Sequence, residues 1–325
     1  MTKLSIITIN RNNAAGLRET MESVFAQTYR DFEYIVVDGA SDDGSVEVVK
    51  EFEQKINPSL QGGDGVGFFT WISEPDTGIY NAMNKGIEIA SGLRIVNTLN
   101  RSEQSGDKHG EADQPKQSGV ENKDNEDGYV LMLNSGDYLV DEYVIERILP
   151  ELDGTDIVQG NTLSQLDGKL WRNRGYGKSD ISFLDVQRGH FLHQASFCKL
   201  SLFGQFGLFR EDYKYVSDTI FFIKALGLGG APFKYVDIDV ANFDTTGFSS
   251  SNDPVIYSTY QAEEQRMQKE LFPGRLYPFC RDVERKVVLY DSLHQHRWIW
   301  NIVMFLKIVN NWIYSELHVP INEKM

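Results

Sequence analysis

The first half of the chain alternates short apolar runs with segments whose apolar residues recur every three or four positions. The apolar runs, which predict buried strands, cover residues 4–9, 32–37, 68–72 and 129–133. The helical repeats cover residues 17–27, 45–52 and 79–90. Strands and helices that alternate through short turns predict an α/β fold, with a mostly parallel sheet and helices on both of its faces.

The second half has a less regular pattern. It predicts a helix over residues 141–149, short strands near 156–163 and 169–172, and then a loop-rich stretch that contains His193. A helix over 215–226 carries Asp218 near its start, and further helices cover 257–271 and 283–293. We therefore divide the chain into an α/β domain over 1–250 and a helical C-terminal extension over 251–325.

A polar insertion, residues 93–127, separates the third helix of the first half from the strand at 129–133. Within it, residues 101–127 have one valine as their only large apolar side chain, with four basic and eight acidic residues. Such a segment buries too little apolar surface to offset the loss of chain entropy on folding. We predict a disordered surface loop; a lid over the site is the alternative.

The tail of the chain is apolar but interrupted. Between Arg297 and Tyr314 its apolar residues are broken by Asn301, Lys307 and Asn310. It lacks the uninterrupted apolar stretch of a spanning helix, and it suits the membrane interface better than the interior. Peripheral membrane contact through 297–317 is one prediction, and packing on the parent domain or on a second subunit of a homo-oligomer is the other.

The composition of the chain excludes some classes of binding partner and metal site. The net charge is −15 and the pI is near 4.9, which argues against nucleic acid as a partner. Two cysteines without metal-ligand spacing indicate neither a disulfide framework nor a zinc site. The N-terminus enters a strand pattern directly, without a signal peptide, so we expect a cytoplasmic protein, with the inner face of the cytoplasmic membrane as the place of any peripheral contact.

Acidic residues follow three predicted parallel strands. They are Asp38, Asp76 and Asp137, the last in the turn Asn134-Ser135-Gly136-Asp137. Each alone fits an ordinary turn or helix cap. Together they point to the crevice at the carboxyl ends of the strands, where a divalent cation would offset their repulsion. The glycine-rich phosphate loops of other nucleotide-binding folds are missing, so a nucleotide here would be held by side chains and a metal.

The ordered set of motifs resembles the family-2 glycosyltransferases of the GT-A fold. The matching segments are residues 5–11, 22–44, 73–86 and 133–137, and the likeness extends over about 1–92 and 128–250. Among members of the family, the bacterial enzymes of exopolysaccharide, capsule and colanic-acid assembly are the most similar. The resemblance implies a nucleotide-sugar donor, usually a UDP-sugar, and a glycan or lipid-linked acceptor.

The resemblance also assigns donor-side residues. It implies that Thr8 and Asn10 line the nucleoside pocket and that Asp38 bonds the base. It places Asp76, Asn84 and Lys85 near the ribose and diphosphate.

The metal motif departs from the commoner family pattern. The resemblance makes Asp137 the ligand of Mn²⁺ or Mg²⁺, but Gly136 stands where many members have a second acid. We expect Asn134 or Ser135 to take over the ribose contact.

On the acceptor side, the family carries a His-Gln pair and an acid at the start of a later helix. These correspond to His193 and Gln194 and to Asp218. An inverting transfer needs a base within reach of the acceptor hydroxyl. Asp218 is the predicted base, against the alternative of a residue that complements a helix dipole. His193 and Gln194 are predicted to contact the acceptor or the diphosphate, against the alternative of a hydrogen-bonded core histidine.

The sequence thus predicts an inverting, metal-dependent glycosyltransferase that acts in surface polysaccharide biosynthesis. The alternatives are a sugar-nucleotide-binding protein with an inactive site and a nucleotidyltransferase.

Overall fold

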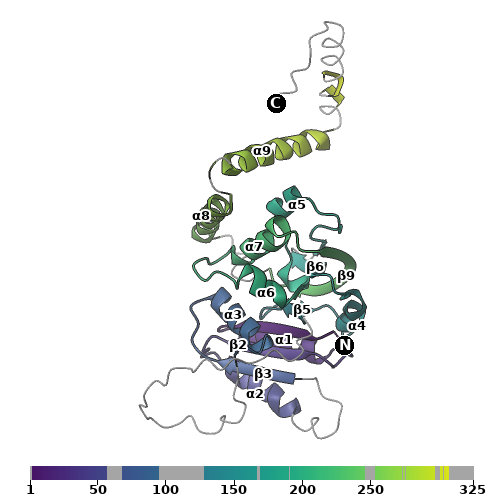
Figure 1. Ribbon diagram of the computed structural model, residues 1–325. Coiled ribbons are helices and arrows are strands. Elements are labelled where there is room, and N and C mark those ends of the chain that lie inside the picture. Colours follow the sequence, from purple (N-terminus) through teal and green to yellow (C-terminus); the bar gives the residue numbers. More distant parts are fainter. Residues whose placement is uncertain are drawn as a thin grey trace. The chain divides into compact units, whose positions relative to one another are not determined.

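The computed structural model describes residues 2–56, 68–94, 128–166, 169–189, 191–245, 253–272, 274, 276–296, 301–302 and 304–306 (Figure 1). The chain forms two compact units, Met1–Glu264 and Gln265–Met325. The predictions for residues 95–127 and for most of the tail 297–317 lie outside the described residues. The predicted division at residue 250 stays a prediction.

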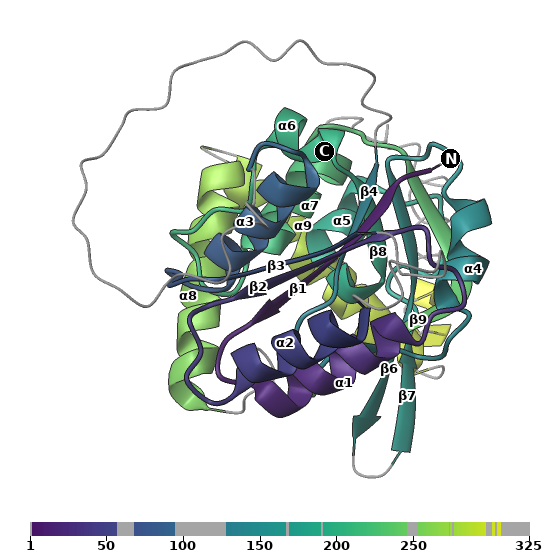
Figure 2. The same ribbon diagram turned by 90° about the horizontal axis from the view of Figure 1, so that it is seen from below.

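Parallel strands form the N-terminal half of the sheet, as the pattern predicts. They are β1 (Leu4–Asn10), β2 (Glu33–Asp38), β3 (Phe68–Ser73) and β4 (Tyr129–Met132), in the order β3-β2-β1-β4. Helices α1 (Ala14–Phe25) and α2 (Ser45–Ile56) lie on one face, and α3 (Ile79–Ala90) lies on the other (Figure 2). The predicted α/β class, of the GT-A type, is confirmed.

The side chains of β1 alternate between the two faces of the sheet, and both faces are covered by helices. Leu4 and Ile6 are fully buried and belong to one core cluster with Leu17 and Met21 of α1. Ile7 lies on the opposite face, where it meets α3 beside Gly86. A strand buried on both faces reads as a continuous apolar run, which is why the pattern predicts it well.

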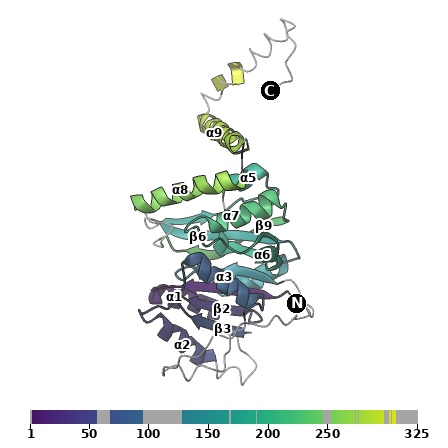
Figure 3. The same cartoon turned by 60° about the vertical axis from the view of Figure 1, so that its left-hand side comes forward.

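The other half of the sheet is mixed. Its strands are β5 (Tyr138–Leu139), β6 (Ile157–Leu166), β7 (Lys169–Asn173), β8 (Ser196–Lys199) and β9 (Phe233–Phe243). Strand β8 is antiparallel to both β4 and β6, while β9 runs parallel to β6. Figure 3 shows β6 and β9 toward the opposite end of the sheet from β2 and β3, in keeping with the strand order.

The sequence pattern misses β8 and β9. Strand β8 is only four residues long, and β9 is only partly buried, with Asp237 and Asp239 among its residues. Arg172 of β7 pairs with both of these carboxylates, at 2.8 and 2.5 Å. Cross-strand ion pairs therefore replace the apolar alternation that would have predicted a strand.

Short helices complete the first unit. They are α4 (Val144–Ile148, followed by η1, Leu149–Glu151), α5 (Phe183–Arg188), η2 (His193–Ala195), α6 (Ser201–Phe206) and α7 (Ser217–Phe222). The predicted helix over 215–226 is α7 continued by the π-helical turn η3 (Ile223–Leu228). Helix α5 and η2 lie where the sequence predicts loops, and a capping box at Ser182 and Asp185 begins α5.

The C-terminal region is helical, as predicted. Helix α8 (Pro254–Leu271) begins in the first unit, and α9 (Leu276–Gln295) belongs to the second. Exposed apolar side chains on α9 include Phe279, Val288 and Leu289. Across the described ranges, no helix combines the length and hydropathy that crossing a membrane requires.

Candidate functional site

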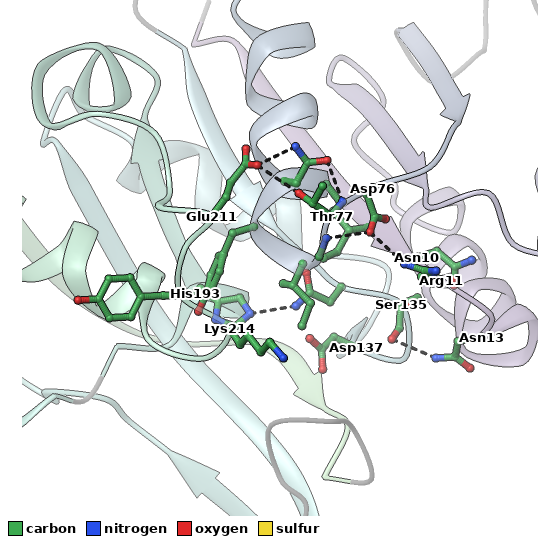
Figure 4. Close-up of a pocket in the computed structure, with 18 of the residues that line it drawn as sticks. Asn10, Arg11, Asn13, Asp76, Thr77, Ser135, Asp137, His193, Glu211 and Lys214 are labelled. Atoms are coloured by element: carbon green, nitrogen blue, oxygen red, sulfur yellow. Dashed lines mark hydrogen bonds and ion pairs between the residues drawn. The ribbon is translucent and has the colours of Figure 1, made fainter. Parts of the chain in front are cut away.

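A pocket of about 730 Å³ opens in the first unit at the carboxyl ends of β1 and β4 (Figure 4). Loops after β1, β3 and β4 form one wall, while η2, the loop before α7 and helix α8 form the other. The polar and charged side chains that line it include Asn10, Arg11, Asp76, Tyr80, Asn134, Ser135, Asp137, His193, Gln194, Glu211, Lys214, Asp244 and Glu263.

Asp137 is the buried acid of this pocket. It is 4% exposed, and its Oδ1 accepts a hydrogen bond from the backbone N–H of Asp244 at 2.9 Å. Burial raises the pKa of Asp137 to about 6, against the lowering effects of that hydrogen bond, of the His193 charge and of the Gln194 side chain. The carboxylate is therefore destabilised as an anion until a cation or another donor reaches it.

The surroundings of residue 136 explain why glycine stands there in place of a second acid. Its φ of 102° lies in the left-handed region, and a Cβ there would come within 2.9 Å of Asp244 Oδ2. The space of a side chain at 136 is thus occupied by a carboxylate from the end of β9. Negative charge on Asp244 also contributes to the raised pKa of Asp137.

His193 connects the two walls. Its Nε2 lies 3.3 Å from Asn134 Nδ2, and its Nδ1 lies 3.4 Å from Asp218 Oδ2. Asp218 Oδ1 accepts hydrogen bonds from the Tyr80 hydroxyl and from the backbone N–H of Thr219, each at 2.9 Å. The structure brings the predicted residues His193 and Asp218 together, but it is His193 that lines the pocket.

The two partners shift each other's pKa in opposite directions. Burial would raise the pKa of Asp218, but the hydrogen bond and charge of His193 bring it below its usual value. Burial would lower the pKa of His193, but the hydrogen bond to Asp218 and the charges of Asp218 and Asp137 raise it. The proton of this pair therefore belongs to the imidazole.

Asp76 lies at the end of β3, with only 5% of its side chain exposed. Its Oδ1 accepts from the backbone N–H of Gly78 at 3.0 Å, and Arg11 approaches the same oxygen at 3.4 Å. A Cβ at Gly39 would lie 2.2 Å from Asp76 Oδ2, so a side chain there would have to displace the carboxylate. The structure places Asp76 in the pocket, as the strand-end argument predicts.

Asn84 and Lys85 face away from the pocket lining. The Asn84 side chain exchanges hydrogen bonds with the Phe209 backbone, at 2.8 and 2.9 Å. Lys85 Nζ donates to the Pro75 carbonyl at 2.8 Å and pairs with Glu74 at 2.8 Å. These residues hold the loops that carry Asp76 and Glu211, and their predicted ligand contacts stay predictions.

Asp38 and Thr8 are fully buried. The Asp38 carboxylate accepts from Asn10 Nδ2 at 2.8 Å, from the Ser41 N–H at 3.0 Å and from the Ser73 hydroxyl at 2.7 Å. Thr8 Oγ1 accepts from the Tyr34 hydroxyl at 3.1 Å. Neither residue lines the pocket, whereas Asn10, held by Asp38, does.

Asn10, Asn134 and Ser135 present polar atoms at the donor wall. Asn10 Oδ1 and Asn134 Oδ1 are buried and accept no hydrogen bond from any residue that the structure describes. The backbone of Ser135 is fixed by its N–H to the Ile9 carbonyl at 3.1 Å and by Asn13 Nδ2 to its own carbonyl at 3.3 Å. Unsatisfied buried acceptors in a pocket are what a ligand's N–H or O–H groups require.

Sequence reasoning missed several charged residues of the pocket, among them Asp244, Lys214 and Glu263. Asp244 follows a strand that was not predicted, and Lys214 precedes α7. Glu263 of α8 accepts from the backbone N–H groups of Lys214 and Tyr215, at 2.8 and 2.9 Å. Figure 4 shows the Lys214 side chain reaching into the pocket beside His193.

The pocket suits a divalent cation that binds few protein atoms and is otherwise coordinated by water and a bound phosphate group. In the described ranges, no cluster of three or more His, Cys, Asp or Glu side chains is arranged to hold a metal ion. Asp137 and the neighbouring Asp244 nevertheless offer hard oxygen atoms, and the raised pKa of Asp137 is the signature of uncompensated negative charge. The residues present therefore fit Mg²⁺ or Mn²⁺ whose remaining ligands come from water and a bound phosphate group.

Sequence comparison connects the chain to glycosyltransferases. Residues 5–98 match the family described as Glycosyl transferase family 2. An uncharacterized glycosyltransferase of Mycobacterium tuberculosis is 29% identical over 266 residues, which are 77% of this chain and 78% of the relative. A PGL/p-HBAD biosynthesis glycosyltransferase of Mycobacterium bovis is 24% identical over 246 residues, 75% of this chain and 77% of that protein.

Solved structures share the fold. The S. aureus TarS 1–349 structure in complex with UDP-GlcNAc superposes with a TM-score of 0.54 at 14% identity, over 82% of this chain and 67% of that chain. Against the longer S. aureus TarS chain the TM-score is 0.53, and the match spans 40% of its length. At this identity the similarity establishes the fold.

Proposed function

Because the chain belongs to glycosyl transferase family 2 and is a glycosyltransferase, we propose that it is an inverting enzyme that uses a UDP-sugar and a divalent cation. The proposed acceptor is a glycan or a lipid-linked glycan. Family membership supports sugar transfer. The identity of the donor, the need for a cation and the stereochemistry of transfer are inferred from the pocket, and experiments are needed to test them.

The observation that carries the proposal is the state of Asp137. It is a buried carboxylate whose pKa is raised to about 6, at the carboxyl end of a central parallel strand and beside a second acid, Asp244. Asp137 and Asp244 would hold Mg²⁺ or Mn²⁺. When bound, such a cation offsets the negative charge that develops on a leaving diphosphate.

The donor wall supports a nucleoside. Asn10 Oδ1 is a buried acceptor without a partner in the described ranges, which suits an N–H group of a nucleobase. Asp76 is placed to accept from ribose hydroxyls. On this proposal Asp38 positions Asn10 through its hydrogen bond, and Lys85 positions Asp76 through the Pro75 carbonyl. TarS, which shares the fold, was solved with UDP and with UDP-GlcNAc, and these are the first ligands to test.

The acceptor wall supports direct displacement. His193, backed by Asp218, lines the same pocket as Asp137, so a base and the proposed leaving-group site share one cavity. An acceptor hydroxyl that attacks the anomeric carbon from the side of His193, opposite the diphosphate, inverts the configuration. No enzyme-bound sugar is required.

UDP release from a panel of UDP-sugars, with GDP-sugars alongside, tests the proposal. With Mn²⁺ present, the wild-type protein is expected to release nucleotide from at least one UDP-sugar, and chelation is expected to stop the release. Asp137→Asn should abolish it, while the matched control Asp180→Asn, which changes an exposed acid outside the pocket, should not. Release that survives chelation and Asp137→Asn would contradict the metal-dependent site.

A further inference from the structure

The predicted base, Asp218, does not present a free oxygen to the pocket. Its Oδ1 accepts from the Tyr80 hydroxyl and the Thr219 N–H, and its Oδ2 lies 3.4 Å from His193 Nδ1. Only 19% of the side chain is exposed, and Asp218 is not among the residues that line the pocket. An acceptor hydroxyl could reach this carboxylate only after His193 or Tyr80 had moved.

His193 occupies the position between Asp218 and the pocket. Nδ1 faces Asp218, and Nε2 faces Asn134 at the pocket wall. A carboxylate can only accept, so the contact with Asp218 Oδ2 places the single proton of a neutral imidazole on Nδ1 and leaves Nε2 as the acceptor. This arrangement directs an unprotonated ring nitrogen toward the pocket.

We propose that His193 is the base that receives the acceptor proton and that Asp218 is a positioning residue that acts through it. This inference rests on the proposed transfer reaction. The acceptor O–H bond breaks and its proton passes to His193 Nε2, while the oxygen forms the new bond to the anomeric carbon. The bond from that carbon to the diphosphate breaks, and its electron pair leaves with the diphosphate.

The surroundings favour this division of roles. A base works best when its pKa lies near the working pH. The pKa of Asp218 lies below its ordinary value, which makes it a weak base, whereas that of His193 is raised from 6.5. The charged groups near His193 are Asp218 from α7, Asp137 from the turn after β4 and Lys214 before α7, and the two carboxylates favour the protonated ring.

Asn134 can follow the proton. Its Oδ1 is buried and accepts no hydrogen bond from the described residues. Once His193 carries a second proton, a half-turn of the amide lets Oδ1 accept from Nε2–H in place of the Nδ2 contact. The same side chain thereby supports both protonation states of the ring.

Kinetics of UDP release from the UDP-sugar that the wild-type protein cleaves fastest separate the two candidate bases. His193→Gln keeps hydrogen-bonding capacity but cannot accept a proton, so kcat should fall about 100-fold to 10 000-fold. The KM for the donor should change by less than about threefold, since the ring does not hold the nucleotide. Asp218→Asn should reduce kcat less and move the acidic limb of the kcat/KM profile to lower pH, because the pKa of His193 falls without the carboxylate.

Chemical rescue and histidine nitrogen NMR make the assignment independent of folding defects. Imidazole should restore UDP release to His193→Gly but not to Asp218→Gly. In the free wild-type protein at high pH, the His193 signals should report the Nδ1–H tautomer. An Nε2–H tautomer, or a His193→Gln variant with wild-type kcat and pH profile beside an inactive Asp218→Asn, would overturn the inference and make Asp218 the base. Absence of any UDP release by the wild-type protein would instead remove the proposed function, and the inference with it.

Discussion

Two aspartates at the ends of buried parallel strands, Asp38 of β2 and Asp137 after β4, differ in how fully their carboxylates are hydrogen-bonded. Both are nearly inaccessible, at 0% and 4% exposed. Asp38 accepts hydrogen bonds from Asn10, Ser41 and Ser73, which use both of its oxygens. Asp137 has fewer donors and another acid beside it, and its pKa rises to about 6.

Position at a strand end therefore does not by itself define a ligand-binding acid. Burial without enough donors leaves an anion that a cation can stabilise, whereas burial with a full set of donors makes a structural anchor. Asp137 is of the first kind and Asp38 of the second. The following predictions test this contrast, in order of decreasing effect.

The largest effect is expected on transfer activity. Asp137→Asn should reduce kcat/KM by about 1000-fold or more, because it removes the buried anion that would hold the cation. Asp38→Asn should leave kcat/KM of the folded protein within about tenfold of wild type. Initial rates of UDP release, corrected for the folded fraction by circular dichroism, measure both. Equal losses of kcat/KM in the two variants would contradict the distinction between Asp137 and Asp38.

The next effect is on stability and its pH dependence. Asp137 has a folded-state pKa raised from 3.8 to about 6. Between about pH 4 and pH 6 the native state therefore binds more protons than the unfolded state, and stability falls as pH rises. At about pH 8, Asp137→Asn should stabilise the metal-free protein by about 3 kcal/mol, from about two pKa units at 1.36 kcal/mol each.

Urea unfolding of wild type and Asp137→Asn across this pH range measures the difference. The gain should vanish below about pH 4, where the wild-type carboxyl is protonated in both states. Saturating Mn²⁺ should restore stability to the wild type and not to the variant. A variant that is less stable than wild type at about pH 8 would contradict the uncompensated state of Asp137.

Asp38→Asn is expected to act in the opposite direction on stability. It replaces an acceptor oxygen with an amide that faces the donors of Ser41 and Ser73, and it should destabilise the fold by about 2 kcal/mol. Urea unfolding tests this. A rise of more than about tenfold in the KM for a UDP-sugar, with unchanged stability, would instead assign Asp38 the direct base contact that the sequence predicts.

The smallest effect concerns the approach of Asp244 to the Asp137 turn. Gly136→Ala introduces a Cβ at φ 102° and 2.9 Å from Asp244 Oδ2. The matched control is Gly154→Ala, at φ 99° with no atom within 4 Å of the added Cβ. The control should lose about 1 kcal/mol from backbone strain alone, and Gly136→Ala about 1 kcal/mol more. Equal losses of stability in the two variants would show that the position of Asp244 does not depend on the absence of a side chain at residue 136.

Local pattern predicted the part of the fold and site that local sequence determines. Strands β1 to β4 are continuous apolar runs, so their ends, and with them Asp76 and Asp137, could be located from the sequence. Parallel strands bring their carboxyl ends to one edge, which explains why these two acids meet in one pocket. Asp38 follows the same rule but is turned inward by Ser41 and Ser73, and no pattern in the chain announces those hydrogen bonds.

The acceptor wall could not be predicted in the same way because its contacts join distant segments. His193 and Asp218 come from η2 and α7, and Tyr80, which completes the network, comes from α3. Asp244 depends on β9, whose alternating charges hide the strand. The residue types pointed to His193 and Asp218. That His193 lines the pocket while Asp218 lies behind it depends on tertiary contacts, which the sequence pattern does not contain.

Calorimetric titration of UDP in the presence and absence of Mn²⁺ tests whether Asp137 supports metal-assisted nucleotide binding. In the presence of Mn²⁺, UDP is expected to bind to wild type, to Asp38→Asn and to the control Asp180→Asn. Asp137→Asn should lose about 100-fold or more in affinity. UDP affinity that is the same with and without Mn²⁺, or that Asp137→Asn leaves unchanged, would contradict a metal-assisted nucleotide site at the end of β4.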